Sequence, residues 1–341
     1  MRRTRRTGIC IMAAVGTLVL IFDAHTAFQG ASDGIQLCIY TVVPSLFPFI
    51  VFSIMLNGAL LGSRAWVLQP LGKLLGIPKG SESLLLLGLI GGYPVGAQCV
   101  HHAYCNGQIS KMDAEHLLSF CNNAGPAFIF GLTTGLFTFK WTGWILWGTQ
   151  ILSALLTGFL LSRRTTGVCS VHADKPVKFN HAVTQSARIV ASICCWVILF
   201  RLLIAVLNRW IICLLPVGLK CTVYGFLELT NGCVELNGIH CEGIRLILAS
   251  MFLSAGGLCV AMQTAAVTPK LNMRCYCIGK LLQTSLCCLL ASFLQYLCYK
   301  ESDRAPFSTL LPLCCTAVVI AIGISIHYSK IRGSISAECV V

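Results

Sequence analysis

The segment 91–98, with the sequence GGYPVGAQ, constrains the fold of this chain more than any other stretch. It follows the apolar run 84–90 and precedes a polar cluster, so it stands where a membrane helix would otherwise continue. Three glycines and one proline within six residues cannot hold a regular helix, because proline lacks a backbone donor and an ordered glycine loses conformational freedom. In hydrocarbon, a break in a helix persists only against protein or a water-filled cavity. The segment therefore predicts a binding site at membrane depth.

The composition agrees with a membrane location. Hydrophobic residues make up 56% of the chain and charged residues only 11%, with a mean hydropathy of +0.79, whereas soluble domains carry about 25% charged residues. The net charge of +13 comes from Lys and Arg scattered over short loops, where they report the orientation of membrane helices. The chain is expected to be an all-α polytopic integral membrane protein, and no nucleic-acid partner is indicated.

Apolar runs predict the membrane crossings. A bilayer core of about 30 Å takes roughly 20 apolar residues per helix. The first run follows a basic N-terminus without a clear small-residue cleavage pattern, so we expect an uncleaved helix there. Two further apolar stretches, 84–106 and 221–240, are interrupted by polar residues or glycine. The runs expected to cross are 8–28, 35–62, 114–138, 141–162, 190–215, 243–265, 275–299 and 308–328.

The positive-inside rule turns the two interrupted stretches into hairpins. Lys111 and the pair Arg163 and Arg164 fall on the cytoplasmic side only if 84–106 enters and leaves the membrane on the same face. Closing the path requires 221–240 to be a re-entrant hairpin from the outside. Two units of helix, hairpin, helix and helix then follow one another with opposite orientation, which is an inverted repeat.

This repeat predicts the organisation of the chain. Inverted repeats with interrupted helices are the architecture in which secondary transporters place a substrate site near the membrane midplane. The expected parts are an N-terminal membrane helix with an external loop (1–34), a first repeat (35–162), a cytoplasmic linker (163–189), a second repeat (190–299), and a C-terminal membrane helix with a tail (300–341).

Glycine, proline and amide residues interrupt the helices at corresponding places in the two repeats. Such pairs of interruptions are the best sequence pointer to a transport site, although small residues also serve close helix packing alone. The residues expected to line the site are Tyr93, Ser119, Asn122, Asn123, Glu228, Thr230, Asn231 and Gln263. The residues expected at hinges or helix breaks are Pro44, Pro48, Gly92, Pro94, Gly96, Gly125, Pro126, Gly232, Gly256 and Gly257.

The 21 cysteines do not predict a disulfide framework, because many lie in adjacent pairs within apolar runs, where Cys behaves as a small hydrophobe. Cys99, His101, His102 and Cys105 form one cluster that could bind a soft metal. No second Cys/His group at ligand spacing follows it. Polar residues at a helix end account equally for the cluster, so no metal or cofactor site is expected.

Four motifs in order resemble the YlbJ-type sporulation integral membrane proteins, within the wider gate or nucleoside-recognition superfamily. They are PSLFPF at 44–49, GYPVGA at 92–97, LLSFCNN at 117–123 and LELTNG at 227–232. The resemblance covers roughly residues 35 to 300. It implies a protein of the outer forespore membrane that passes dipicolinic acid towards the developing spore. Related gate domains transport nucleosides or ferrous iron, so the domain by itself leaves the substrate open.

Dipicolinate is a flat aromatic dicarboxylate, so its site needs hydrogen-bond donors and positive potential. The amides and hydroxyls among the expected site residues could supply neutral donors, and broken helices could offer free backbone N–H groups. Glu228 would repel such a dianion unless it is protonated or binds a coupling cation, and it could instead lie at the external water boundary. Arg201 and Arg245 are its candidate charge partners, unless both only snorkel from helix ends.

No enzyme motif is present. The sequence contains no phosphate-binding loop, no Ser/His/Asp order and no metalloprotease helix. The expected function is transport of a small anion such as dipicolinate, passively or coupled to an ion. The alternatives are a gate-type transporter of nucleosides or metal ions and a non-transporting structural component of the membrane. The expected partners are the lipid bilayer and the anionic substrate, with a homo-oligomer left open.

Overall fold

The computed structural model describes residues 2–60, 66–162 and 177–299, and beyond them Glu301, Arg304, Ile320, Ala321, Gly323 and Ile324. Every regular element within these residues is a helix. The first part of the chain contains α1 (Arg2–Phe22), α2 (Ala24–Leu37), the π-helical turn η1 (Cys38–Val42), α3 (Val43–Leu60), the 3-10 turn η2 (Trp66–Leu68), α4 (Gln69–Leu74), α5 (Glu82–Ile90), α6 (Val95–Cys105), α7 (Lys111–Leu118), α8 (Pro126–Thr133) and α9 (Thr142–Leu160). The second part contains α10 (Phe179–Trp210), η3 (Ile212–Leu214), α11 (Val217–Leu227), α12 (Leu229–Glu235), η4 (Leu236–Gly238), α13 (Glu242–Ala255), α14 (Gly257–Val267) and α15 (Met273–Cys298).

Five helical stretches of the described part are long and apolar enough to cross a membrane, and they make this chain an integral membrane protein. They are Ala24–Leu56, Thr142–Leu160, Phe179–Trp210, Glu242–Val267 and Met273–Cys298. Their positions overlap five of the expected crossings. The expected crossing 114–138 is instead two eight-residue helices, α7 and α8, on either side of a non-helical segment. The expected crossing 308–328 lies almost entirely outside the described residues.

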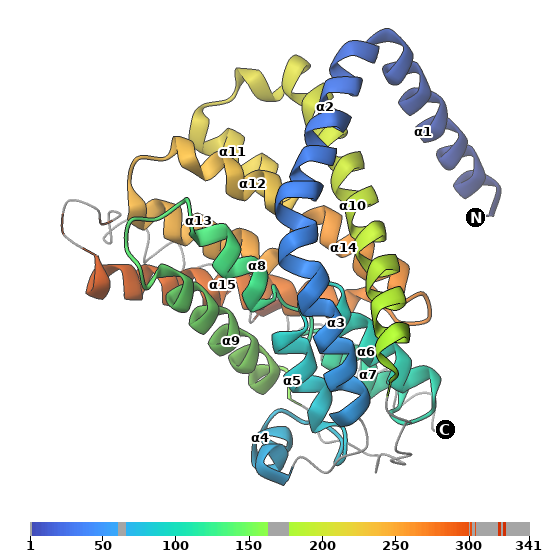
Figure 1. Cartoon of the computed structure of the whole chain (residues 1–341), viewed down its shortest axis with the longest axis vertical. Coiled ribbons are helices and arrows are strands. Elements are labelled where there is room, and N and C mark those ends of the chain that lie inside the picture. Colours follow the sequence, from blue (N-terminus) through green and yellow to red (C-terminus); the bar gives the residue numbers. More distant parts are fainter. Residues whose placement is uncertain are drawn as a thin grey trace.

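The residues 23–34, expected as an external loop, are mostly helical. They belong to α2, which packs along α10 in the opposite direction, and Figure 1 shows the two helices side by side along the length of the molecule. A Cβ added to Gly30 would lie 2.7 Å from the Ala205 side chain, and one added to Gly34 would lie 2.9 Å from the Ile198 backbone. Small residues therefore let the two backbones approach closely, as is common between membrane helices.

Pro44 and Pro48 do not end their helix. The helix continues through Pro48 in α3, and the π-helical turn η1 lies immediately before α3. Local π-helical geometry and hydroxyl side chains can accommodate the backbone groups that a proline leaves unpaired. The Ser45 hydroxyl does so by donating a hydrogen bond to the Thr41 carbonyl at 2.6 Å.

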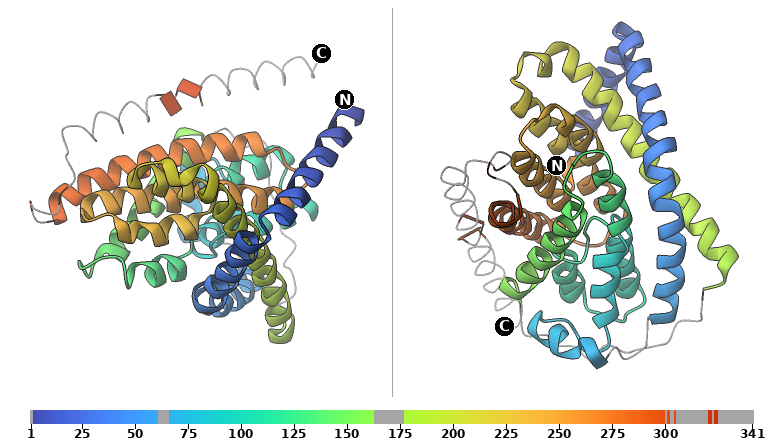
Figure 2. Two further views of the ribbon diagram at one scale, coloured as in Figure 1. Left: turned by 90° about the horizontal axis from the view of Figure 1, so that it is seen from above. Right: turned by 60° about the vertical axis from the view of Figure 1, so that its left-hand side comes forward.

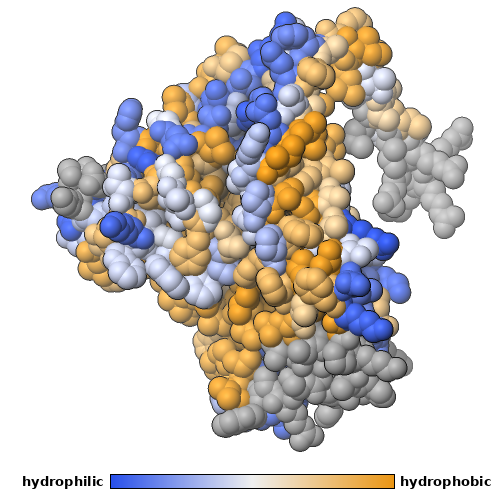
Figure 3. Space-filling model, viewed as in Figure 1, coloured by the Kyte–Doolittle hydropathy of each residue, from blue (hydrophilic) through white to orange (hydrophobic). Residues whose placement is uncertain are grey.

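The remaining long helices run across this pair. Helices α9, α13 and α15 pack against one another, and Figure 2 shows α15 nearly end-on in a view where α2 and α3 still run lengthwise. Figure 3 shows apolar residues gathered over the middle and lower part of the visible face, with hydrophilic residues more frequent at its upper end and left. Tyr40 and Phe52 on the α2–α3 helix are 79% and 66% exposed. Exposed aromatic side chains of this kind are expected where a helix faces lipid.

Short helices meet in the interior between these two groups. The pairs α5–α6 and α11–α12 each pack against each other. A Cβ on Gly88 or Gly96 would lie 2.2 Å from the Cys121 carbonyl oxygen. Likewise, a Cβ on Gly232 would lie 2.1 Å from the Gly225 Cα. Gly96 and Gly232, expected at helix breaks, therefore lie inside α6 and α12 and permit close packing instead.

Candidate functional site

The helix breaks of the two halves converge on one region. Between α5 and α6, Gly92 has a φ of +75° and precedes a cis Tyr93–Pro94 peptide bond. Between α13 and α14, Gly256 and Gly257 have φ values of +72° and +71°, a left-handed conformation that glycine adopts without a Cβ clash.

Two further breaks complete the region. Gly125 is the N-cap of α8 and Pro126 its first residue. Glu228 separates α11 from α12 in an extended conformation and caps α12. Each break leaves backbone groups unpaired near the middle of the fold, where side chains must satisfy them.

A buried lysine lies at the centre of the first polar cluster. Lys280 on α15 is 5% exposed. Its Nζ lies 3.0 Å from the Tyr93 hydroxyl, 3.2 Å from Asn123 Oδ1 and 2.9 Å from Gln283 Oε1. The Gln283 Nε2 donates to the same Asn123 oxygen at 2.7 Å. Lys280 thus joins the α5–α6 break, the α7–α8 break and α15, and we call these four residues the Lys280 cluster.

The neighbouring amide, Asn122, has a separate set of partners. Its Oδ1 accepts from the Ala97 backbone N–H at 3.3 Å, and its Nδ2 donates to the Thr264 hydroxyl at 2.9 Å. Ser119 donates to the His116 carbonyl at 2.6 Å. Asn122 therefore connects α6 to α14, and Ser119 satisfies the end of its own helix.

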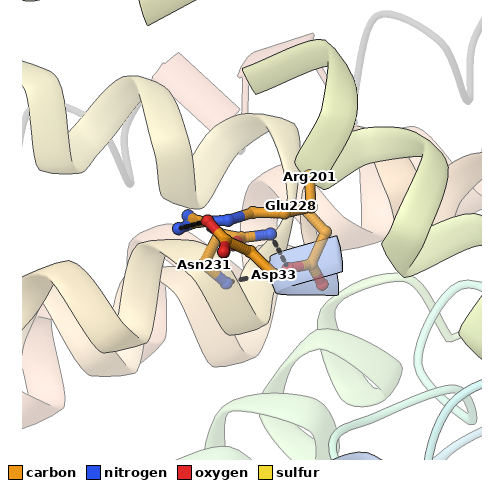
Figure 4. A network of polar contacts seen from close by, with 4 residues as sticks. All are labelled: Asp33, Arg201, Glu228 and Asn231. Atoms are coloured by element: carbon orange, nitrogen blue, oxygen red, sulfur yellow. Dashed lines mark hydrogen bonds and ion pairs between the residues drawn. The ribbon is translucent and has the colours of Figure 1, made fainter. Parts of the chain in front are cut away.

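A second polar cluster surrounds Glu228. This carboxyl group is 2% exposed, and its Oε2 accepts hydrogen bonds from the backbone and the side-chain nitrogen of Asn231, each at 2.8 Å. Arg201 on α10 donates to Asn231 Oδ1 at 2.9 Å and forms an ion pair with Asp33 at 3.3 Å. Figure 4 shows these four residues, which run from the exposed side chain of Asp33 to the buried Glu228.

The two expected partners of Glu228 are engaged elsewhere. Arg201 reaches the carboxyl group through Asn231 rather than directly. Arg245 donates to the carbonyl groups of Leu136 and Ile239 at the α8–α9 side of the fold. Among the described residues, Glu228 forms no ion pair.

A small cavity of about 40 Å³ lies between the breaks of the two halves. Its polar lining comes from Tyr93, Glu228, Thr230 and Gln263, with Gly125 also on its wall. The rest of the lining is apolar and consists of Val42, Leu46, Ala124, Phe128, Ile193, Val197, Leu229 and Val260. The structure thus places four of the eight expected site residues around one cavity.

The other four expected site residues lie outside this lining. Asn123 and Asn231 stand directly behind it, because Asn123 shares Lys280 with Tyr93 and Asn231 bonds to Glu228. Ser119 and Asn122 serve packing between helices and do not line the cavity. Lys280 and Gln283 were not among the expected residues. A lysine within the apolar run 275–299 was the available signal, since a charged residue in a membrane helix is costly and is commonly functional.

The cluster of Cys and His on α6 does not assemble around a common point. Cys105 Sγ lies 3.6 Å from the His101 ring, while His102 faces Asn106 at 3.4 Å. Among the residues that the structure describes, no group of three or more His, Cys, Asp or Glu side chains could hold a metal ion.

One curated protein shares detectable similarity with this chain. Over 148 residues it is 29% identical to the sporulation integral membrane protein YlbJ of Bacillus subtilis (strain 168), which covers 42% of this chain and 36% of that protein. The matched region thus spans little more than a third of the relative's length. No family model and no solved structure matches the chain. The chain is an integral membrane protein with distant similarity to a sporulation membrane protein.

Proposed function

We propose that this protein is a membrane transporter of spore formation that moves a small anion, such as dipicolinic acid, across the outer forespore membrane. The observation that carries the proposal is the cavity to which Tyr93 contributes from the first half of the chain and Glu228 from the second. The similarity to a sporulation integral membrane protein supports the cellular process.

The proposed mechanism is alternating access between inverted repeats. In this proposal, α5–α6 and α11–α12 are re-entrant hairpins that enter from opposite faces, and the breaks at Gly92 and Gly256 act as hinges. Discontinuous helices at a repeat interface are typical of secondary transporters. Polar and glycine-rich breaks that meet in the interior, rather than at the ends of helices, support this reading.

The size of the cavity defines the state of the transporter in this proposal. Pockets that enclose drug-sized ligands measure roughly 300–1,000 Å³, whereas this one measures about 40 Å³. An aromatic dicarboxylate therefore requires the broken helices to separate before it can enter. The structure then corresponds to a closed, empty state, and access to either side requires a hinge movement.

Uptake into liposomes tests the proposal. Purified protein reconstituted in liposomes should accumulate labelled dipicolinate above the level of protein-free liposomes, and unlabelled dipicolinate should compete. Competition by nucleosides or ferrous iron instead would assign the chain to another gate-type transport activity. Absence of uptake for all three substrates from folded, correctly inserted protein would favour a structural role and contradict the proposal.

A further inference from the structure

Lys280 is buried without an opposite charge. Removing an ammonium group from water costs several kcal/mol unless other groups replace its hydration. The two ion pairs found within the described residues are Asp33–Arg201 and Asp23–Arg209, and neither involves Lys280. The partners of Nζ are a phenol and two amide oxygens. The side chain is therefore solvated by neutral groups only.

The hydrogen bonds around Lys280 require it to carry three protons. Tyr93 donates its own hydroxyl proton towards the Leu253 and Ser254 carbonyls, so its oxygen accepts from Nζ. The Asn123 Nδ2 donates to the Phe120 carbonyl at 2.7 Å, which directs its oxygen towards Lys280.

Gln283 supplies the third acceptor. Its Nε2 donates to Asn123, which leaves its oxygen for Nζ. Three acceptors use the three N–H donors of an ammonium group, whereas a neutral amine has only two. The arrangement thus holds a positive charge.

This charge lies directly behind the cavity. Tyr93 lines the cavity and also accepts from Nζ, so a single side chain separates the two. The Nζ further stands 5.0 Å from the centre of the Tyr93 ring and 6.0 Å from that of Tyr276, a distance at which aromatic faces stabilise cations. Glu228 also lines the cavity, but its carboxyl group is bonded to Asn231.

We propose that Lys280 is the carboxylate-binding group of the transporter. On opening, a carboxylate of the substrate replaces one amide oxygen of the Lys280 cluster and supplies the missing counter-charge, while the Tyr93 ring packs against a flat aromatic body. The ligand class is a planar aromatic carboxylate. This inference rests on the proposed function and names the residue that recognises the anion. Charge-assisted hydrogen bonds are about twice as strong as neutral ones, so the exchange favours an anion over a neutral analogue.

Binding measurements on the full chain in nanodiscs test this assignment. The probes are labelled dipicolinate, picolinate with one carboxylate, and pyridine-2,6-dicarboxamide as a neutral analogue of the same shape. Lys280→Met should weaken dipicolinate binding by about tenfold or more and leave binding of the dicarboxamide unchanged. Lys280→Arg, which keeps the charge, should retain part of the affinity. Lys270→Gln, which removes an exposed lysine, is the matched control and should bind as the wild type does.

A second variant covers the case in which Lys280→Met fails to fold. Asn123→Asp places a carboxylate where Asn123 Oδ1 now lies, 3.2 Å from Nζ. The new ion pair should preserve or raise the melting temperature and should abolish dipicolinate binding, because the counter-charge is already present.

Each result separates the inference from the proposed function. Unchanged dipicolinate affinity in folded Lys280→Met or Asn123→Asp protein would overturn the inference, even if the wild type transports dipicolinate. Equal loss of dipicolinate and dicarboxamide binding in Lys280→Met would also overturn it, since it would mark Lys280 as a structural residue. A wild-type protein that binds neither carboxylate would overturn the inference and the proposed function together.

Discussion

Lys280 on α15 and Asn123 in the break between α7 and α8 are joined by a 3.2 Å hydrogen bond that spans 157 positions of the sequence. The adjacent residue Gly279 fixes this register, because a Cβ there would lie 2.1 Å from the Ser119 carbonyl oxygen. The close approach of α15 to the break is therefore a condition for the Lys280 cluster to form.

Substitution of Gly279 tests this dependence. Gly279→Ala must push α15 away from Ser119, and overpacking of this kind costs about 1–3 kcal/mol. We expect a lower midpoint of thermal unfolding in detergent and weaker dipicolinate binding. Gly148→Ala on α9 is the matched control, because no atom lies within 4 Å of the added Cβ. An unchanged midpoint in Gly279→Ala would show that α15 can shift without cost.

The network from Asp33 to Glu228 predicts unequal effects of its two charged residues. The Asp33 side chain is 54% exposed, so Asp33→Asn should cost no more than about 1 kcal/mol of stability. Arg201→Met should cost more, about 1–3 kcal/mol, because it leaves the buried Asn231 oxygen without its donor. Thermal unfolding of the two variants measures the difference. Equal midpoints would mean that Asn231 finds another partner.

The sequence predicted the membrane class and the long helices because apolar length alone decides them. It also predicted the breaks at Gly92, Gly256 and Gly257, where the φ values require glycine. It did not distinguish these from Gly96 and Gly232, because a glycine needed for close packing and one needed for a left-handed turn look alike in a sequence.

The site was predictable to a similar degree. Tyr93, Glu228, Thr230 and Gln263 stand out as polar residues in apolar surroundings, and they meet at one cavity. The direction of a side chain within a broken helix is decided by tertiary contacts, and so Ser119 and Asn122 point to other partners. The helical course of residues 23–34 was missed for the same reason, since close contact with α10 compensates for their polar composition.

The inverted-repeat topology predicts that two loops lie on opposite sides of the membrane. Asn106 follows α6 and Asn237 follows α12, and both are exposed. Asn106 is a better labelling site than its neighbour Gly107, whose φ of +69° disfavours a side chain. In a cysteine-free background, Asn106→Cys and Asn237→Cys should react with an impermeant maleimide from opposite faces of sealed vesicles. Labelling from the same face would contradict the inverted repeat.

Glu228→Gln separates a structural from a transporting role of the buried carboxyl group. The amide oxygen of glutamine can still accept from the Asn231 backbone N–H, which Glu228 Oε2 now does at 2.8 Å. The variant should therefore insert and accumulate normally. In the proposed transporter, Glu228 offsets the charge of an anionic substrate by taking up a proton or a cation, and an amide can do neither. We thus expect dipicolinate uptake into liposomes to fall to background. Glu235→Gln, at the end of the same short helix α12 and not on the cavity wall, is the matched control and should transport normally. Full uptake by Glu228→Gln at normal expression would limit this carboxyl group to capping α12.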